Sequence, residues 1–311
     1  MRILMTGGSG LIGRALTADL HKAGHRVTVL TRNPQRAAAL LPPETVVHPW
    51  DARSPEGWSA LLNEVEAVVN LAGESIAGEN LRAILLRRWT PAYKRRIRES
   101  RLRVGALLTE AIRQAASRPK VLLQASAVGY YGDTGPREVD ESAPPGRDFL
   151  AEVCKAWEAS TAPVAQLGVR RVVLRTGLVL AAEGGILPVM LLPVRAFIGG
   201  PLGSGKQAVP WIHLADEVAA IRFLLENEGC SGPYNLCAPQ PVTQAEFARL
   251  AGRVLRRPAF LPTPAALLKL TLGEKAQLVL EGQRALPRRL LEAGFSFRYP
   301  DLEAALRALL G

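Results

Sequence analysis

Cysteine is scarce in this chain, and the few cysteines are poorly placed for metal or disulfide chemistry. Cys154, Cys230 and Cys237 are odd in number, and no two of them have the Cys-x-x-Cys spacing of a zinc site. Disulfide frameworks are concentrated in small secreted domains, so this cysteine usage fits a reducing compartment. We therefore expect neither a metal centre nor a disulfide scaffold.

Long apolar runs are also lacking. The apolar stretch from Ile186 to Ile198 is interrupted by Pro188, Pro193 and Arg195, and it is too short to span a bilayer. A strand-like run begins at residue 2, which leaves no room for a signal peptide before it. We expect a cytoplasmic protein that does not bind membranes.

Acidic side chains are outnumbered: 28 Asp and Glu stand against 39 Lys and Arg, which gives a net charge of +11. A basic stretch from Arg87 to Arg103 is the strongest indication of nucleic-acid binding. However, Ile97, Val104 and Leu108 recur in it at helical spacing, and only two aromatic residues lie nearby. We interpret the basic residues as the solvated face of an amphipathic helix and expect no nucleic-acid partner: Lys94, Arg95, Arg96, Arg98, Arg101 and Arg103.

What the chain does contain is a glycine turn at its start. Residues 2–6 form a short apolar run typical of a buried strand, and a helical pattern begins at residue 11. A strand, a glycine turn and a helix in this order bind dinucleotides, because the helix start offers unpaired N–H groups to a pyrophosphate. The expected cofactor contacts come from Gly7, Gly8, Ser9, Gly10, Leu11, Ile12 and Gly13.

The second expected strand, residues 26–31, lacks the acidic residue that usually follows it. No Asp or Glu occurs between Asp19 and Glu44, and Thr31, Arg32 and Arg36 occupy the region where a ribose-binding carboxylate would stand. A guanidinium matches a phosphate in charge and in geometry. The sequence therefore favours NADP(H) over NAD(H).

Further strands are expected at residues 46–51, 67–73, 121–126 and 171–175, alternating with helices. This alternation predicts an α/β fold, a Rossmann-type doubly wound parallel sheet with a smaller C-terminal α/β substrate domain. Ligands bind at the carboxyl ends of such strands. Further cofactor contacts are therefore expected from Trp50, Asp51, Leu71, Ala72, Gly73, Glu74, Gly177 and Leu178.

Beyond residue 180 prolines are frequent and the alternation loosens. We expect a Rossmann domain over residues 1–180, to which residues 208–228 return as a short segment and a helix. Residues 181–207 and 229–311 would then form the smaller domain.

Several motifs together resemble the extended short-chain dehydrogenase/reductase superfamily. They are T-G-G-S-G-L-I-G at 6–13, N-L-A-G at 70–73, S-A-V-G-Y-Y-G at 126–132, R-T-G at 175–177 and W-I-H-L-A-D-E-V at 211–218. The tail P-R-R-L-L-E-A-G-F-S-F-R-Y-P-D-L-E at 287–303 is similar to that of the atypical "epimerase family" proteins. The resemblance implies a domain that binds NADP(H) and a smaller domain that closes over a substrate.

The resemblance also implies a chemistry, from which this chain departs. Usual members use a tyrosine as acid and base, a lysine four residues later that lowers the tyrosine pKa and binds ribose, and a serine that orients the substrate. Ser126 matches the serine and Lys155 the lysine, but Ala151 stands where the tyrosine would be. Tyr130 and Tyr131 are the nearest alternative phenols.

Three functions remain open. The chain is an NADP(H)-dependent oxidoreductase or epimerase for a small substrate, for which an anionic or nucleotide-sugar-like compound is an option. Alternatively it is a catalytically silent NADP(H)-binding sensor or interaction protein, or, least favoured, a nucleic-acid binder. A homodimer is left open by the sequence.

Overall fold

The computed structural model describes residues 1–76, 78 and 88–311. Its centre is a seven-stranded sheet with the order β11-β7-β5-β4-β1-β2-β3, in which every neighbouring pair is parallel. The strands are β1 (Arg2–Thr6), β2 (Arg26–Thr31), β3 (Val46–Pro49), β4 (Ala67–Asn70), β5 (Val121–Ala127), β7 (Arg170–Thr176) and β11 (Gly232–Leu236). The predicted doubly wound sheet is confirmed.

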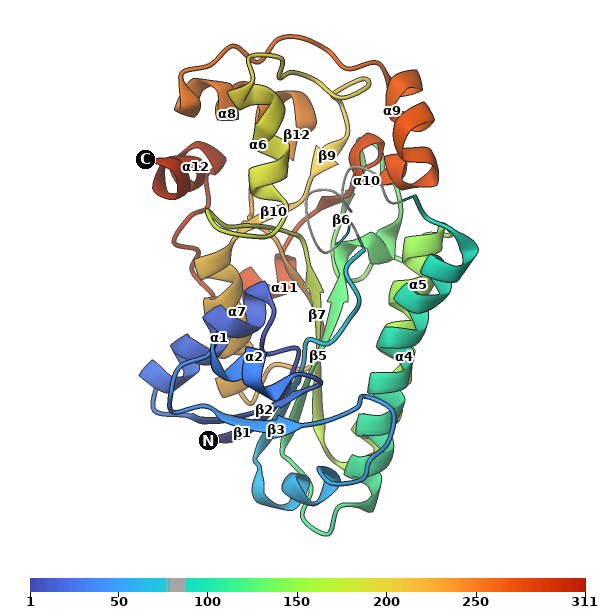
Figure 1. Cartoon of the computed structure of the whole chain (residues 1–311), viewed down its shortest axis with the longest axis vertical. Coiled ribbons are helices and arrows are strands. Elements are labelled where there is room, and N and C mark those ends of the chain that lie inside the picture. The colour runs from blue at the N-terminus through green and yellow to red at the C-terminus, as the bar shows by residue number, and fades with distance from the viewer. Residues whose placement is uncertain (77, 79–87) are drawn as a thin grey trace.

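The sheet is covered on both faces, and the alternation along β1 shows how. Ile3 and Met5 join a cluster with α1 (Leu11–Lys22) and α7 (Leu214–Glu226), whereas Leu4 joins a second cluster with α4 (Pro91–Gln114). α5 (Phe149–Ser160) packs beside α4. Figure 1 shows α1 and α7 on one side of the sheet and α4 and α5 on the other. The central strands are therefore buried on both faces, as parallel strands require.

The remaining elements are short. The helices are α2 (Pro34–Ala38), α6 (Leu187–Arg195), α8 (Gln244–Leu255), α9 (Ala265–Leu272), α10 (Gln277–Leu280), α11 (Arg288–Glu292) and α12 (Leu302–Leu310), with 3₁₀ turns η1 (Ser59–Glu64), η2 (Val128–Tyr131), η3 (Ala162–Leu167) and η4 (Gly273–Ala276). Three two-stranded pairs join β8 (Leu178–Leu180) with β10 (Trp211–His213), β9 (Ala208–Val209) with β12 (Val242–Thr243), and β6 (Glu138–Val139) with β13 (Arg284–Ala285).

One expected boundary needs correction. Residues 229–311 were assigned to the smaller domain, but β11 pairs with β7 along its length, from Gly232 opposite Val172 to Leu236 opposite Thr176. The strand is short, and only pairing with a distant strand decides which sheet it joins. The main sheet therefore continues to Leu236, and the rest of the division into domains stays a prediction.

The C-terminal elements form a cluster of their own. Leu191 of α6, Phe247 of α8 and Leu306 of α12 are buried together in it. A capping box starts α8, because Thr243 and Glu246 exchange hydrogen bonds as their spacing indicates. Figure 1 shows α6, α8 and α12 at the end of the molecule away from β3.

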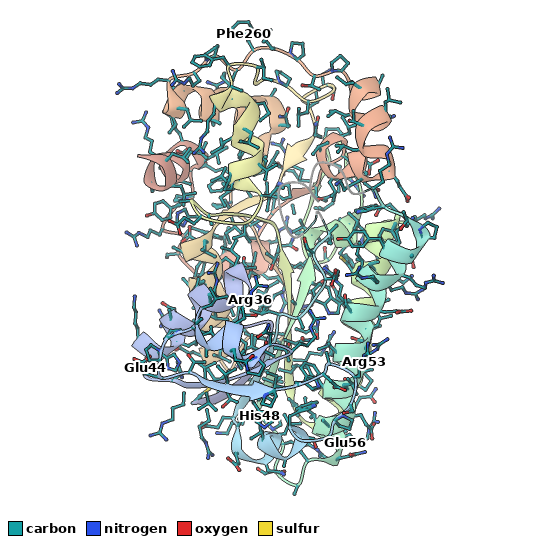
Figure 2. All side chains as sticks on the ribbon, viewed as in Figure 1. Arg36, Glu44, His48, Arg53, Glu56 and Phe260 are labelled. Carbon is teal, nitrogen blue, oxygen red and sulfur yellow. The ribbon has the colours of Figure 1, made fainter. Side chains whose placement is uncertain are left out.

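Two loop segments, one after α6 and one after α8, expose apolar side chains. Phe197, Ile198 and Phe260 are 52%, 61% and 71% exposed, and Figure 2 shows Phe260 at the opposite end of the molecule from His48 and Glu56. Among the described residues no helix is long and apolar enough to cross a membrane. The three cysteines are free and buried.

Candidate functional site

The glycine turn has the geometry of a dinucleotide-binding loop. A Cβ on Gly13 would lie 2.4 Å from the carbonyl oxygen of Gly7, and a Cβ on Gly7 would lie 2.6 Å from the backbone of Leu71. Gly7 also has a φ of 75°, in the left-handed region that favours glycine. Neither position accepts a side chain without backbone movement, so these glycines let β1, α1 and the chain after β4 approach closely.

The start of α1 is open to an anion. Gly10 is the N-cap and offers no side-chain cap, and the first turn contains no acidic residue. The N–H groups of Leu11, Ile12 and Gly13 thus stand at the positive end of the helix dipole. Gly8 packs on Val29, and Ser9 is half-buried beside the loop. The turn lies between β1 and β4, where the strand order reverses, which is the usual ligand position in such sheets.

The end of β2 carries basic residues, as expected. Arg32 and Arg36 are exposed, Thr31 is half-buried, and Asn33 caps α2 by accepting from the Arg36 N–H at 3.0 Å. Figure 2 shows Arg36 on α2. Nearby in sequence, the Nε of Arg14 is buried without a hydrogen-bond partner among the described residues. The region thus presents cations and contains no acid for a ribose hydroxyl.

Trp50 and Asp51 are less available for contact with a cofactor than their position in the sequence suggests. Trp50 is buried, packs against Trp58 with ring centroids 5.3 Å apart, and donates its Nε1 hydrogen to the Ser54 carbonyl. The Asp51 carboxylate accepts from the N–H groups of Arg53 and Ser54, and these bonds lower its pKa. Both residues therefore shape the loop after β3, and their expected contact with the adenine stays a prediction.

The chain after β4 holds Leu71 and Ala72 half-buried and Gly73 exposed. The Glu74 carboxylate pairs with Arg96 of α4, with an N–O distance of 2.5 Å. Arg101 of α4 lies directly beneath this segment: a Cβ on Gly73 would be 3.1 Å from its Cζ. Arg101 is only 6% exposed, which corrects its assignment to a solvated face.

The rest of the basic face is solvated. Arg95, Arg96, Arg98 and Arg103 are exposed, and Lys94 pairs with Glu274 at 2.5 Å. Arg87, the first residue of the basic stretch, lies outside the described residues. This arrangement agrees with an amphipathic helix, and the absence of a nucleic-acid partner stays a prediction.

A buried charged network begins at Ser126. Its Oγ donates to Glu158 Oε1 at 2.7 Å, and Arg175 donates to both oxygens of the same carboxylate at 2.9 and 3.0 Å. The Arg175 and Glu158 side chains are 4% and 14% exposed. Burial lowers the pKa of Arg175, but its bonds with Glu158 outweigh this and raise it overall. The network therefore contains a fully formed ion pair.

The two tyrosines after Ser126 have different surroundings. Tyr131 is buried, donates to Asn235 Oδ1 at 2.7 Å and accepts from Arg175 at 3.0 Å. Burial raises the pKa of Tyr131 to about 12, which is the wrong direction for proton transfer near neutral pH. Tyr130 is half-buried, and its ring lies over the Arg175 guanidinium at 3.5 Å. Tyr130 is therefore the more accessible of the two phenols.

Lys155 lies on the exposed side of α5, and its expected contact with the cofactor ribose stays a prediction. Lys155 is 58% exposed and lies 3.7 Å from Glu152 on its own helix. Cys154, the residue before it, lies beside Ser126 and the backbone of Ala127, and its burial raises the thiol pKa to about 12. Neither the lysine nor its tyrosine partner stands beside Ser126, and buried Ala151 carries no ionisable group.

The segment after β7 is closely packed. The N–H of Gly177 donates to the Leu236 carbonyl at 2.8 Å, and that of Leu178 donates to the Pro210 carbonyl at 2.6 Å. A Cβ on Gly177 would lie 2.2 Å from this second oxygen. Glycine is therefore required at this crossing, and the expected contacts of Gly177 and Leu178 with the cofactor stay a prediction.

The W-I-H-L-A-D-E-V segment serves structure. His213 caps α7 by accepting from the Ala215 N–H at 3.0 Å and stacks on Tyr299. Glu217 is fully buried: one carboxylate oxygen accepts from Thr176 at 2.8 Å, and the other has no partner among the described residues. Burial raises the pKa of Glu217 to about 8. No cluster of His, Cys, Asp or Glu in the described part of the chain could hold a metal ion.

Comparison with known proteins agrees with this geometry. Residues 3–237 match the model of the NAD dependent epimerase/dehydratase family. The chain belongs to this family. Residues 263–309 match a domain of unknown function, DUF1731, which covers most of the tail that motivated the resemblance. The resemblance drawn from the motifs is thereby confirmed.

Relatives of this epimerase-family chain match it over nearly its whole length. "Epimerase family protein SDR39U1 homolog, chloroplastic" of Arabidopsis thaliana is 41% identical over all of this chain and 87% of its own length. The Bacillus subtilis "Epimerase family protein YfhF" is 38% identical, covering 100% and 98%. A crystal structure of human SDR39U1 with NADPH has a TM-score of 0.84 at 36% identity, covering 99% of both chains. A UDP-glucose 4-epimerase from Thermus thermophilus, at 22% identity and a TM-score of 0.77, shares the fold.

Sequence reasoning missed three residues of the site: Arg101, Glu158 and Arg175. Arg175 occurs in the R-T-G motif at 175–177, but it and Glu158 become partners only where the fold brings β7 and α5 together. Arg101 was grouped with its exposed neighbours because of its charge. Its spacing could have identified it, since it lies four residues after buried Ile97 and three before buried Val104.

Proposed function

We propose that this protein binds NADP(H) in preference to NAD(H), at the glycine turn between β1 and β4. The observation that carries the proposal is the combination of an uncapped helix start with an end of β2 where Arg32 and Arg36 replace an acid. The human relative with the same fold was crystallised with NADPH. The helix start would bind the pyrophosphate, and the arginines the 2′-phosphate.

Titration of NADPH and NADH into the protein tests this proposal. We expect tighter binding of NADPH, and Arg32→Glu should weaken NADPH much more than NADH. Arg98→Glu is the matched control, because it makes the same change of charge on an exposed part of α4. Equal affinity of the wild-type protein for both cofactors would refute the preference.

We further propose that the bound cofactor exchanges a hydride with a small substrate, as in an oxidoreductase or epimerase. NADP(H) supplies or accepts the hydride, and Tyr130 transfers the accompanying proton. Tyr130 supports this role because it is half-buried, whereas Tyr131 is buried and already bonded to Asn235 and Arg175.

Tyr130→Phe removes the hydroxyl and keeps the ring on Arg175. Acid–base groups contribute about 10²- to 10⁴-fold in rate, so turnover should fall by that order while NADPH affinity stays unchanged. Substrates would be sought by nicotinamide absorbance with sugar nucleotides and small carbonyl compounds, and by product analysis, since an epimerase regenerates its cofactor. Full activity of Tyr130→Phe would exclude this tyrosine. Tyr131→Phe is the comparison, and should act mainly through stability.

A second function is favoured by one observation. Ala151, which stands where usual members of the superfamily have the tyrosine, is buried and can transfer no proton. The alternative is therefore a protein that binds NADP(H) and does not turn over. Tight NADPH binding with no product from any tested substrate would support this alternative.

A further inference from the structure

The side chain of Arg101 is a buried cation, and burial lowers its pKa although the nearby charge of Glu74 acts in the opposite direction. It is 6% exposed, and it forms no ion pair with any residue that the structure describes. Its one hydrogen bond in that part of the chain runs from Nη1 to the Ile97 carbonyl of its own helix, at 2.9 Å. Burying a charge in this way is unfavourable unless a partner compensates it.

Neighbouring side chains compensate this charge only in part. The Glu74 carboxylate forms its salt bridge with Arg96, and its attraction for Arg101 does not offset the lowering of the Arg101 pKa by burial. Cys154 lies close, but burial raises its pKa to about 12, so the thiol is neutral near pH 7. The indole of Trp157 lies 4.9 Å from the guanidinium and contributes only its ring face. An apolar side chain of similar length would fill this space as well, so packing does not explain why an arginine is buried here.

The guanidinium lies beneath Gly73, at the ligand-binding edge of the sheet. Nη1 is engaged, whereas Nε and Nη2 have no hydrogen bond to a residue that the structure describes. A Cβ on Gly73 would lie 3.1 Å from Cζ, 3.2 Å from Nη2 and 3.3 Å from Nε, over the part of the group that carries these two nitrogens. Gly73 is exposed and follows β4, next to the glycine turn. A guanidinium offers this pair of parallel N–H groups to two oxygens of one carboxylate or phosphate.

We propose that Arg101 is the anion-binding residue of the substrate site, with its Nε and Nη2 donating to a carboxylate or phosphate group of the substrate beside Gly73. The inference rests on the proposed function, because it places that group next to bound NADP(H). Gly73 is part of the same arrangement, because a side chain there would crowd the guanidinium from above its plane. The oxyanion neutralises the buried charge when the substrate binds.

Calorimetric titration of the NADPH-saturated protein with acetate, oxalate and inorganic phosphate tests the proposal and separates carboxylate from phosphate. The wild-type protein should bind at least one of these probes. Arg101→Met should weaken that probe by at least about 30-fold, as expected when one partner of a buried charge pair is removed. Arg101→Lys should weaken it less, since the charge remains and the paired geometry is lost.

Two further variants test whether a loss of probe binding is specific to the Arg101 guanidinium. Arg103→Met removes an exposed arginine of the same helix and should leave probe affinity unchanged. Gly73→Ala keeps the charge but places a methyl group over Cζ, Nη2 and Nε, which should displace the guanidinium and also weaken the probe. Its φ does not lie in the left-handed region, so alanine is compatible with the backbone. Thermal unfolding of each variant shows that it is folded.

The outcomes are distinct. If no probe binds the wild-type protein, or if Arg101→Met binds it equally well, the proposal is wrong. If Arg101→Met loses NADPH affinity and keeps the probe, the anion belongs to the cofactor, and the substrate assignment is overturned. Failure of the wild-type protein to bind NADPH would instead contradict the proposed function. Titration of the cofactor-free protein with the probes would then still test Arg101.

Discussion

Removal of Arg175 provides the sharpest test of the buried network. Arg175→Met would break two hydrogen bonds to Glu158 and one to Tyr131, and would leave a carboxylate that is only 14% exposed without its cation. Breaking a buried pair from one side costs about 3–5 kcal/mol, which lowers the folding equilibrium constant by about 150- to 5,000-fold. We expect a loss of this size in the free energy of unfolding.

Urea unfolding measures the loss from the shift in midpoint, provided that the slope with denaturant stays unchanged. The double variant Glu158→Met with Arg175→Met should recover at least about 2 kcal/mol, because no charge is then left buried. Burial raises the pKa of a carboxylate that has lost its partner, so the deficit of Arg175→Met should shrink as the pH falls from 7 to 5. The matched control Arg113→Met, which breaks a surface pair with Glu110, should cost at most about 1 kcal/mol.

Two results would refute this reasoning. A loss below about 1 kcal/mol for Arg175→Met would show that the pair is solvated or replaceable. A double variant as unstable as the sum of the single variants would show that the two side chains do not interact, since distant sites are additive.

Three further predictions concern other regions. The pKa of Glu217 in the folded protein, about 8, exceeds its ordinary value of 4.5. The neutral carboxyl therefore stabilises the protein at low pH, and this contribution is lost as the pH rises from 4.5 to about 8, by up to about 1.4 kcal/mol per pH unit. Glu217→Gln should remove this pH dependence of the unfolding free energy, measured from pH 5 to 8. Gly13→Ala places a methyl group 2.4 Å from the Gly7 carbonyl, and calorimetry should show loss of NADPH binding and a lower melting temperature. Nucleic-acid binding by the basic face should be weak and strongly salt-dependent in electrophoretic shift assays, and a sub-micromolar complex abolished by changing Arg95 and Arg98 would contradict us.

The sequence alone determined the features that depend on neighbouring residues. The glycine turn and six of the seven strands of the main sheet agree with the structure to within a few residues, and the spacing of Thr243 and Glu246 agrees with the observed capping box. Each rests on a local signal: the spacing of apolar residues, the backbone freedom of glycine, or a side chain that accepts from an N–H two or three residues on.

Tertiary structure decided what depends on pairing across the chain. The segment from Gly232 to Leu236 joins the main sheet because it pairs with Val172 to Thr176, which lie about 60 residues earlier. On α5 a shift of one residue turns a side chain by about 100°, so Cys154 lies beside Ser126 while Lys155 points to solvent.

The charged groups of the site show the same division. Glu158 and Arg175 lie in different elements, and only packing of α5 against the sheet makes them a buried pair. Arg101 follows the helical spacing of the buried residues of α4, although charged side chains on such a helix are usually exposed. Spacing fixed the face of the helix on which it lies, but its burial beside Gly73 depends on how α4 packs against the strand ends, because solvation of a charge is a property of all its neighbours in space.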